Sequence, residues 1–138
     1  MDPELKAAYA RIRAREMQAR ERLFLEFPTF SVTTVAGPEG RLLPTATVPE
    51  WRREQRIFAF EHHGHDRYPA FQFDAGLPKP IIGRLLQLVR PDDGWHAMFW
   101  FAAANAWLDG DKSPVDLLDV DPDAVAEAAC HANDEISD

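Results

Sequence analysis

Apolar residues recur at helical spacing through the first 27 positions of the chain. This spacing predicts a helix from Pro3 to about Phe27, because Pro3 suits a first helical turn and Asp2 is a good N-cap. The other faces alternate Arg with Glu, which is typical of a solvated, ion-paired surface, and a dimer contact is the alternative. The apolar positions are Leu5, Tyr9, Ile12, Ala19 and Leu23.

The next segment has the pattern of a helix-turn-helix. Residues 31–37 favour a short helix capped by Ser31 and ended by Gly37. A second short helix over residues 45–54 accommodates Pro49 only in its first turn. Two short helices joined by a turn that contains glycine are typical of DNA-reading motifs, although this turn is longer than usual.

Two β-type runs then flank a histidine-rich tip. The apolar run Ile57–Phe60 and the returning run Tyr68–Phe73 enclose residues 62–66, in which Gly64 can turn the chain. The pattern predicts a β-hairpin, and a hairpin after a basic helix is typical of a winged helix-turn-helix. The chain would thus begin with a small helical head that carries a short β-hairpin wing.

The remaining chain returns to helical spacing. Prolines precede or open most of its predicted helices, and Ser113–Pro114 and Asp121–Pro122 combine an N-cap with a first-turn proline. We therefore predict a mainly α protein, with residues 1–74 as the N-terminal helix and winged head and residues 75–138 as a helical domain. The predicted helices of this domain span residues 80–89, 95–108, 115–118 and 122 to about 132.

The most apolar of these segments is the one over residues 95–108. We expect its aromatic side chains to lie mostly in the core. Any that stays exposed would form an association surface, because Trp and Phe are enriched at such surfaces. The set consists of Trp95, Phe99, Trp100, Phe101 and Trp107.

The formal net charge of -8 is divided unevenly along the chain. Residues 1–73 contain 11 Lys or Arg and 10 Asp or Glu, whereas residues 74–138 contain 4 and 13. The first half could meet phosphate, and any macromolecular partner of the second half should be basic. With one cysteine, no apolar span and no signal-like N-terminus, we expect a cytoplasmic protein without an internal disulfide or membrane contact.

Basic and hydroxyl residues of the second predicted helix are the candidates for contacts with DNA. A guanidinium pairs well with phosphate oxygens, so the arginines are the best phosphate contacts. A solvated basic edge is the alternative interpretation. The candidates are Thr45, Thr47, Arg52, Arg53 and Arg56.

Three further groups could carry chemistry, and each has a more ordinary interpretation. Adjacent histidines on a hairpin tip should point apart, a Cys–His pair on a helix diverges by about 100°, and the aspartates lack the order of an EF-hand. We therefore expect no enzyme activity, no metal and no cofactor. The groups are His62, His63 and His65; Cys130 and His131; and Asp109, Asp111 and Asp116.

An ordered set of residues in the second half resembles the Xre/MbcA/ParS-like toxin-binding domain. After the run Tyr68–Asp74 (YPAFQFD), an apolar helix is followed by the pattern Asn, Leu-x-Gly, Pro, Leu-Leu and an Ala-rich helix. The resemblance covers roughly residues 51–132. The matching positions are Trp100, Asn105, Leu108, Gly110, Pro114, Leu117, Leu118 and Ala124–Ala129.

The resemblance implies an antitoxin that pairs with a RES-domain toxin, an enzyme that degrades NAD. In similar proteins the C-terminal part obstructs the NAD-binding cleft, which must be positively charged, and the acidic tail of this chain suits that role. Asn105, Gly110 and Pro114 would shape the turn rather than touch the toxin. The candidates for toxin contact are Asp116, Asp119, Asp121, Asp123, Glu127, His131, Asp134 and Glu135.

Relatives of this kind often repress their own promoter through an N-terminal helix-turn-helix. We expect a homodimer within a hetero-oligomer with the toxin, and promoter DNA as a further partner. The alternative is a stand-alone DNA-binding regulator whose C-terminal helices only dimerise. Truncation after Leu118 should abolish neutralisation while leaving the helical signal largely intact.

Overall fold

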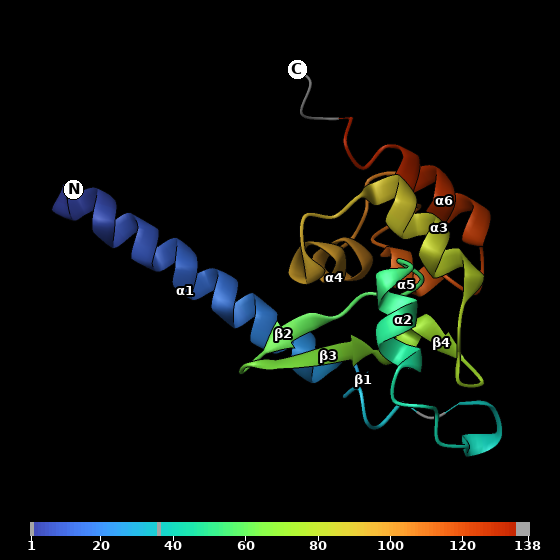
Figure 1. Cartoon of the computed structure of the whole chain (residues 1–138). Helices are drawn as coiled ribbons and strands as arrows, with labels where there is room; N and C mark the ends of the chain where they lie inside the picture. The colour runs from blue at the N-terminus through green and yellow to red at the C-terminus, as the bar shows by residue number, and fades with distance from the viewer. Residues whose placement is uncertain (1, 36, 135–138) are drawn as a thin grey trace.

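The chain folds into a mainly α body from which one long helix projects, as the computed structural model shows (Figure 1). The structure describes residues 2–35 and 37–134. The predicted mainly α class is confirmed. The elements are α1 Pro3–Glu26, β1 Thr29–Phe30, η1 Pro38–Gly40, α2 Thr47–Arg53, β2 Phe60–His62, β3 His65–Pro69, η2 Ala70–Gln72, β4 Phe73–Asp74, β5 Leu77–Pro78, α3 Pro80–Val89, α4 Gly94–Ala102, α5 Pro114–Leu117 and α6 Pro122–Cys130.

Helix α1 matches its predicted extent and is capped as the sequence indicates. The Asp2 carboxylate accepts a hydrogen bond from the Glu4 amide at 3.3 Å, and Pro3 occupies the first turn. No residue of this 24-residue helix is fully buried. Only its C-terminal end packs on the body, where Leu23 and Phe24 border the main core.

A three-stranded antiparallel sheet has the order β1–β3–β2. The predicted hairpin forms, with Phe60 opposite Arg67 and a two-residue turn at His63–Gly64. Both turn residues have positive φ, 51° and 80°, as the tight hairpin turn that suits strand twist requires. The strands are shifted toward the tip relative to the prediction. Whether this hairpin acts as a DNA-binding wing stays a prediction.

The prediction of a first short helix in the helix-turn-helix is wrong. Its described residues form a turn, in which the Ser31 amide donates to Thr34 Oγ1 at 2.8 Å and the Thr34 amide donates to the Ser31 carbonyl at 3.0 Å. Hydroxyl side chains offer backbone groups partners other than helical ones, which explains the difference. The second predicted helix forms as α2, and Pro49 lies in its first turn as expected.

Two apolar clusters form the core. The smaller surrounds Trp51 and Tyr68 beneath α2. The larger joins α3, α4 and α6 to Phe58 and Phe60 from the first half of the chain. The predicted division at residue 74 stays a prediction. The buried members of the larger cluster are Phe58, Phe60, Ile82, Leu85, Leu86, Val89, Trp95, Ala97, Met98, Phe101, Leu118, Val125, Ala126 and Ala129.

Helix α4 begins where the chain passes closest to β2. The Asp93 carboxylate caps it by accepting from the His96 amide at 2.8 Å. A Cβ on Gly94 would lie 1.8 Å from the Ala59 carbonyl oxygen, so this position requires glycine. The helix ends at Ala102 rather than at the predicted Leu108, and a loop follows. Within the described residues, no helix has the length and apolar character needed to cross a membrane.

Candidate partner-binding surface

The loop between α4 and α5 is built by the residues that carried the family resemblance. The Asn105 side-chain oxygen Oδ1 accepts a hydrogen bond from the Trp107 backbone amide at 2.9 Å. The Asn105 backbone amide donates to the Lys112 carbonyl at 3.0 Å. Gly110 turns the chain with a φ of 65°. The expectation that Asn105 and Gly110 shape this turn is confirmed.

Helix α5 is fixed at its start by a reciprocal capping box. Ser113 Oγ accepts from the Asp116 amide at 3.3 Å, and the Asp116 carboxylate accepts from the Ser113 amide at 2.9 Å. The bond from the Ser113 amide, aided by the Ser113 hydroxyl and the charge of Lys112, holds the pKa of Asp116 below its ordinary value. Pro114 follows the cap and is buried. The loop therefore has a defined shape at both ends.

Trp107 projects from this loop into solvent. Its side chain is 56% exposed, and its ring stacks on His131 at 3.6 Å between centroids and 10° between planes. His131 Nδ1 lies 2.6 Å from the Asp134 carboxylate. The sequence predicts a long helix, buried on most sides, that contains Trp107, and any exposed member of its aromatic set would form an association surface. The helix ends before Trp107, which is the exposed member of that set.

The exposed face of α6 and the turn after it continue from Trp107. Asp123, Glu127, His131 and Asp134 recur at spacings of four, four and three residues, which places them along one side of the helix. Their opposite face carries the buried Val125, and the helix packs on α3. We call Trp107 together with these four residues the Trp107 surface.

Three other predicted toxin contacts have partners within the chain. Asp116 belongs to the capping box, Asp119 binds Lys79 Nζ at 2.9 Å, and Asp121 caps α6 by accepting from the Ala124 amide at 3.2 Å. These carboxylates hold the C-terminal helices in place. Glu135 lies outside the described residues.

The arginines predicted to contact DNA lie at the end of α2 and directly after it. Arg52 Nη1 lies 2.7 Å from Asp66, Arg53 pairs with Glu50, and Arg56 lies 3.7 Å from Glu54. Partial burial opposes the charge of Arg52, but hydrogen bonds with Asp66 and Tyr68 outweigh it and raise its pKa. Thr45 is exposed and Thr47 half-buried.

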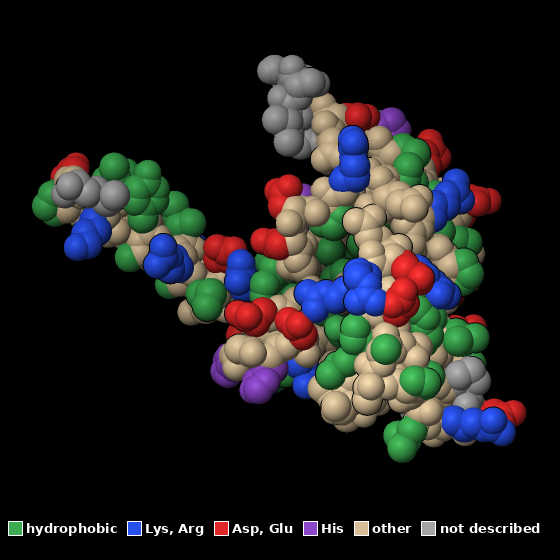
Figure 2. All heavy atoms as spheres, viewed as in Figure 1, with side chains coloured by type: hydrophobic (Ala, Val, Ile, Leu, Met, Phe, Trp, Pro, Cys, Tyr) green, Lys and Arg blue, Asp and Glu red, His purple; other side chains and the backbone are tan. Residues whose placement is uncertain are grey.

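Figure 2 shows Lys and Arg side chains standing among Asp and Glu on the visible face. Each of the three predicted arginine contacts thus has an acidic neighbour, which opposes a continuous phosphate-binding surface. The basic and hydroxyl candidates are brought to one region, but their charge is locally balanced.

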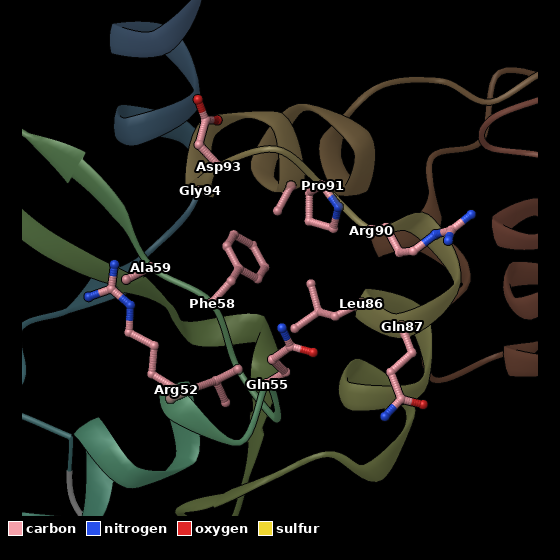
Figure 3. A pocket seen from close by; sticks show the side chains of 12 residues that line it. Arg52, Gln55, Phe58, Ala59, Leu86, Gln87, Arg90, Pro91, Asp93 and Gly94 are labelled. Carbon is pink, nitrogen blue, oxygen red and sulfur yellow. The ribbon is translucent and has the colours of Figure 1, made fainter.

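A pocket of about 480 Å³ lies between α2, α3 and α4 (Figure 3). Phe58 and Leu86 contribute apolar wall, and Arg52 and Arg90 lie at its edges. Its one lining carboxylate is Asp93, which already caps α4. The described lining residues contain no paired nucleophile and base.

Comparisons of the chain with protein-family models, with curated proteins and with solved structures found no match.

Proposed function

We propose that this protein is an antitoxin that binds a RES-domain, NAD-degrading toxin and blocks it sterically. One observation carries the proposal: a tightly built turn holds Trp107 in solvent against His131, beside the acidic face of α6. A large exposed aromatic residue on a rigid loop is the kind of side chain that dominates binding energy at protein interfaces.

The charge of this region favours a basic partner. Asp123, Glu127 and Asp134 lie on the Trp107 surface, and the second half of the chain carries most of the negative charge. A cleft that binds the pyrophosphate of NAD needs positive potential, which would attract this surface and speed association. The antitoxin would then exclude NAD by occupying the mouth of the cleft, without chemistry of its own.

A homodimer through α1 belongs to the same proposal. Leu5, Tyr9 and Ile12 are each about half-exposed, at 45%, 53% and 59%, and lie on one side of the helix. The same side carries Leu23, which packs against the body of its own chain. Glu16, which pairs with Arg20, interrupts this side between Ile12 and Leu23. The uncovered apolar stretch from Leu5 to Ile12 fits a second copy of α1.

Repression of its own promoter is the further part of the proposal, and it depends on Arg52 and Arg53. Their side chains are 43% and 66% exposed, so DNA could compete with Asp66 and Glu50 for them. Arg52→Ala combined with Arg53→Ala should weaken promoter binding and flatten its salt dependence in a mobility-shift titration. Unchanged binding would remove DNA from the proposal and leave the antitoxin role intact.

The decisive experiment co-expresses the tagged full chain with the adjacent reading frame and follows cellular NAD. We expect NAD loss with the neighbour alone, and co-purification with NAD preserved when both are present. Truncation after Leu118 is a poor test, because it removes Val125 and Ala129 from the core. Absence of co-purification, with NAD untouched in both cultures, would contradict the proposal and favour the stand-alone regulator.

A further inference from the structure

Three side chains with metal-binding atoms converge where α1 crosses the hairpin. His62 Nε2 lies 2.9 Å from Glu21 Oε1, and His63 Nε2 lies 3.8 Å from the same oxygen. The three ligand atoms lie within 4.8 Å of one another. Glu21 comes from α1, His62 ends β2, and His63 is the first residue of the turn. Residues 41 positions apart in the chain thus meet at one point.

The two histidines do not diverge, contrary to the expectation for adjacent residues on a tip. Their rings stack at 4.0 Å and 10°, because His63 adopts a left-handed conformation with a φ of 51°. The other face of the His62 ring stacks on Phe24 at 3.7 Å and 7°. His62 is therefore clamped, with a side chain only 14% exposed, while His63 is 77% exposed.

We propose that Glu21, His62 and His63 bind a divalent transition metal of the zinc class. Two imidazole nitrogens and one carboxylate oxygen form a donor set that Zn²⁺ uses when it keeps a fourth position open. Ligand atoms about 2.0–2.2 Å from a tetrahedral ion lie roughly 3.3 Å from each other. The separations of 2.9 and 3.8 Å from Glu21 Oε1 bracket that value. Because an imidazole binds an ion in the plane of its ring, the exposed His63 must rotate out of its parallel stack on His62 for both Nε2 atoms to reach one ion.

The surrounding charges set the conditions for binding. Glu21 supplies one negative charge. The Arg67 guanidinium lies nearby, 5.7 Å from the Phe24 ring. Arg67 Nε donates a hydrogen bond to the Thr29 hydroxyl at 2.9 Å. The ion would take the place of the hydrogen bond between His62 Nε2 and Glu21 Oε1. A bound ion would tie α1 to the hairpin tip.

The test is titration of the full chain, freed of any affinity tag, with ZnCl₂ in competition with a chromophoric chelator. We expect one ion per chain. We also expect at least about tenfold weaker binding in Glu21→Gln and His63→Ala, because even the loss of a residue that only supports a metal ligand typically lowers metal affinity about tenfold or more. His65→Ala is the matched control, because His65 is an exposed histidine of the same hairpin that does not belong to the group of three converging ligand atoms. We expect it to leave binding unchanged.

Two further measurements test the same site. Co²⁺ should give the visible absorption of a tetrahedral site in the wild type and lose it in Glu21→Gln, a nearly isosteric change that leaves the His62–Phe24 stack in place. His62→Ala also removes the stack on Phe24, so its circular dichroism is compared with that of the wild type before its metal binding is measured. Binding that is absent, or that falls equally in His65→Ala, would reduce the cluster to an ion pair that anchors α1.

Discussion

The Gln72 side chain bonds to both backbone groups of Phe58. Its Oε1 accepts from the Phe58 amide at 2.7 Å and its Nε2 donates to the Phe58 carbonyl at 2.9 Å, with a second bond to the Pro69 carbonyl at 3.2 Å. Gln72 is fully buried. One amide therefore acts as the missing neighbouring strand for residue 58 and seats Phe58 against Phe101 in the core.

Replacing Gln72 with Leu should destabilise the protein by about 2–4 kcal/mol, because three backbone groups, two of them on Phe58, lose their bond to the side chain. Urea unfolding followed by circular dichroism measures the loss. Gln87→Leu is the control, since Gln87 is exposed on α3. Equal stability of the two variants would mean that Phe58 finds other partners.

The close approach of α4 to the hairpin predicts opposite effects at two helical glycines. Gly94→Ala should cost at least about 3 kcal/mol, because its Cβ would overlap the Ala59 carbonyl, 1.8 Å away. Gly83→Ala, whose Cβ would lie 3.5 Å from the nearest atom, should be neutral or gain up to about 1 kcal/mol from helix propensity. Thermal melts of both variants check this.

The capping box makes a small part of the stability depend on pH. The pKa of Asp116 is lowered in the fold, so its contribution is present above the ordinary carboxyl value of about 3.9 and disappears as pH falls through the lower folded value. At neutral pH Asp116→Asn should lose less than the about 1 kcal/mol typical of a helix cap. As pH falls through the lowered folded pKa of Asp116, the melting curve of the variant should approach that of the wild type. Asp111→Asn, on the exposed loop, serves as the control.

Binding of the proposed toxin should depend on Trp107. Trp107→Ala should weaken the complex by at least about 2 kcal/mol, roughly 30-fold in Kd, while the melting temperature changes little because the ring is largely exposed. Leu42→Ala, at 88% exposure and outside the Trp107 surface, should bind normally. Calorimetry with the purified product of the adjacent reading frame measures the affinity of both variants. Equal affinities would show that the interface does not include Trp107.

Self-association should depend on the apolar side of α1. Ile12→Glu should weaken a dimer by at least about 100-fold, because burying an unpaired carboxylate costs several kcal/mol. Ala14→Glu places the same charge on the opposite side of the helix and should leave the dimer intact. Sedimentation velocity over a concentration series distinguishes them. A wild-type monomer throughout would refute the dimer.

Helix starts could be predicted from the sequence because their determinants are local. Pro3, Pro80, Pro114 and Pro122 each open a helix, since a first-turn proline lacks only an amide that the helix does not use. The Asp121 cap was predictable for the same reason. The turn at residues 31–34 was missed, because hydroxyl side chains there compete with helical hydrogen bonds.

Features that depend on distant contacts could not be predicted. In the sequence, Trp107 continues the apolar run of α4. In the structure the helix ends at Ala102, and the hydrogen bond from the Trp107 amide to the Asn105 side chain belongs to the loop that follows. The meeting of Glu21 with His62 depends on where α1 crosses the hairpin. Gln72 fits no apolar pattern, although a polar residue between two phenylalanines was a signal that the core uses its amide.

Helix α1 projects from the body, so a small change of angle at its packed end moves its free end much further. The free part of the helix, from about Arg20 to Pro3, spans roughly 25 Å at 1.5 Å per residue. A rotation of ten degrees at the anchor would sweep its tip through about 4 Å by that geometry. An ion bound between Glu21 and His62 would therefore move the far end of α1 through a larger distance than the anchor itself moves.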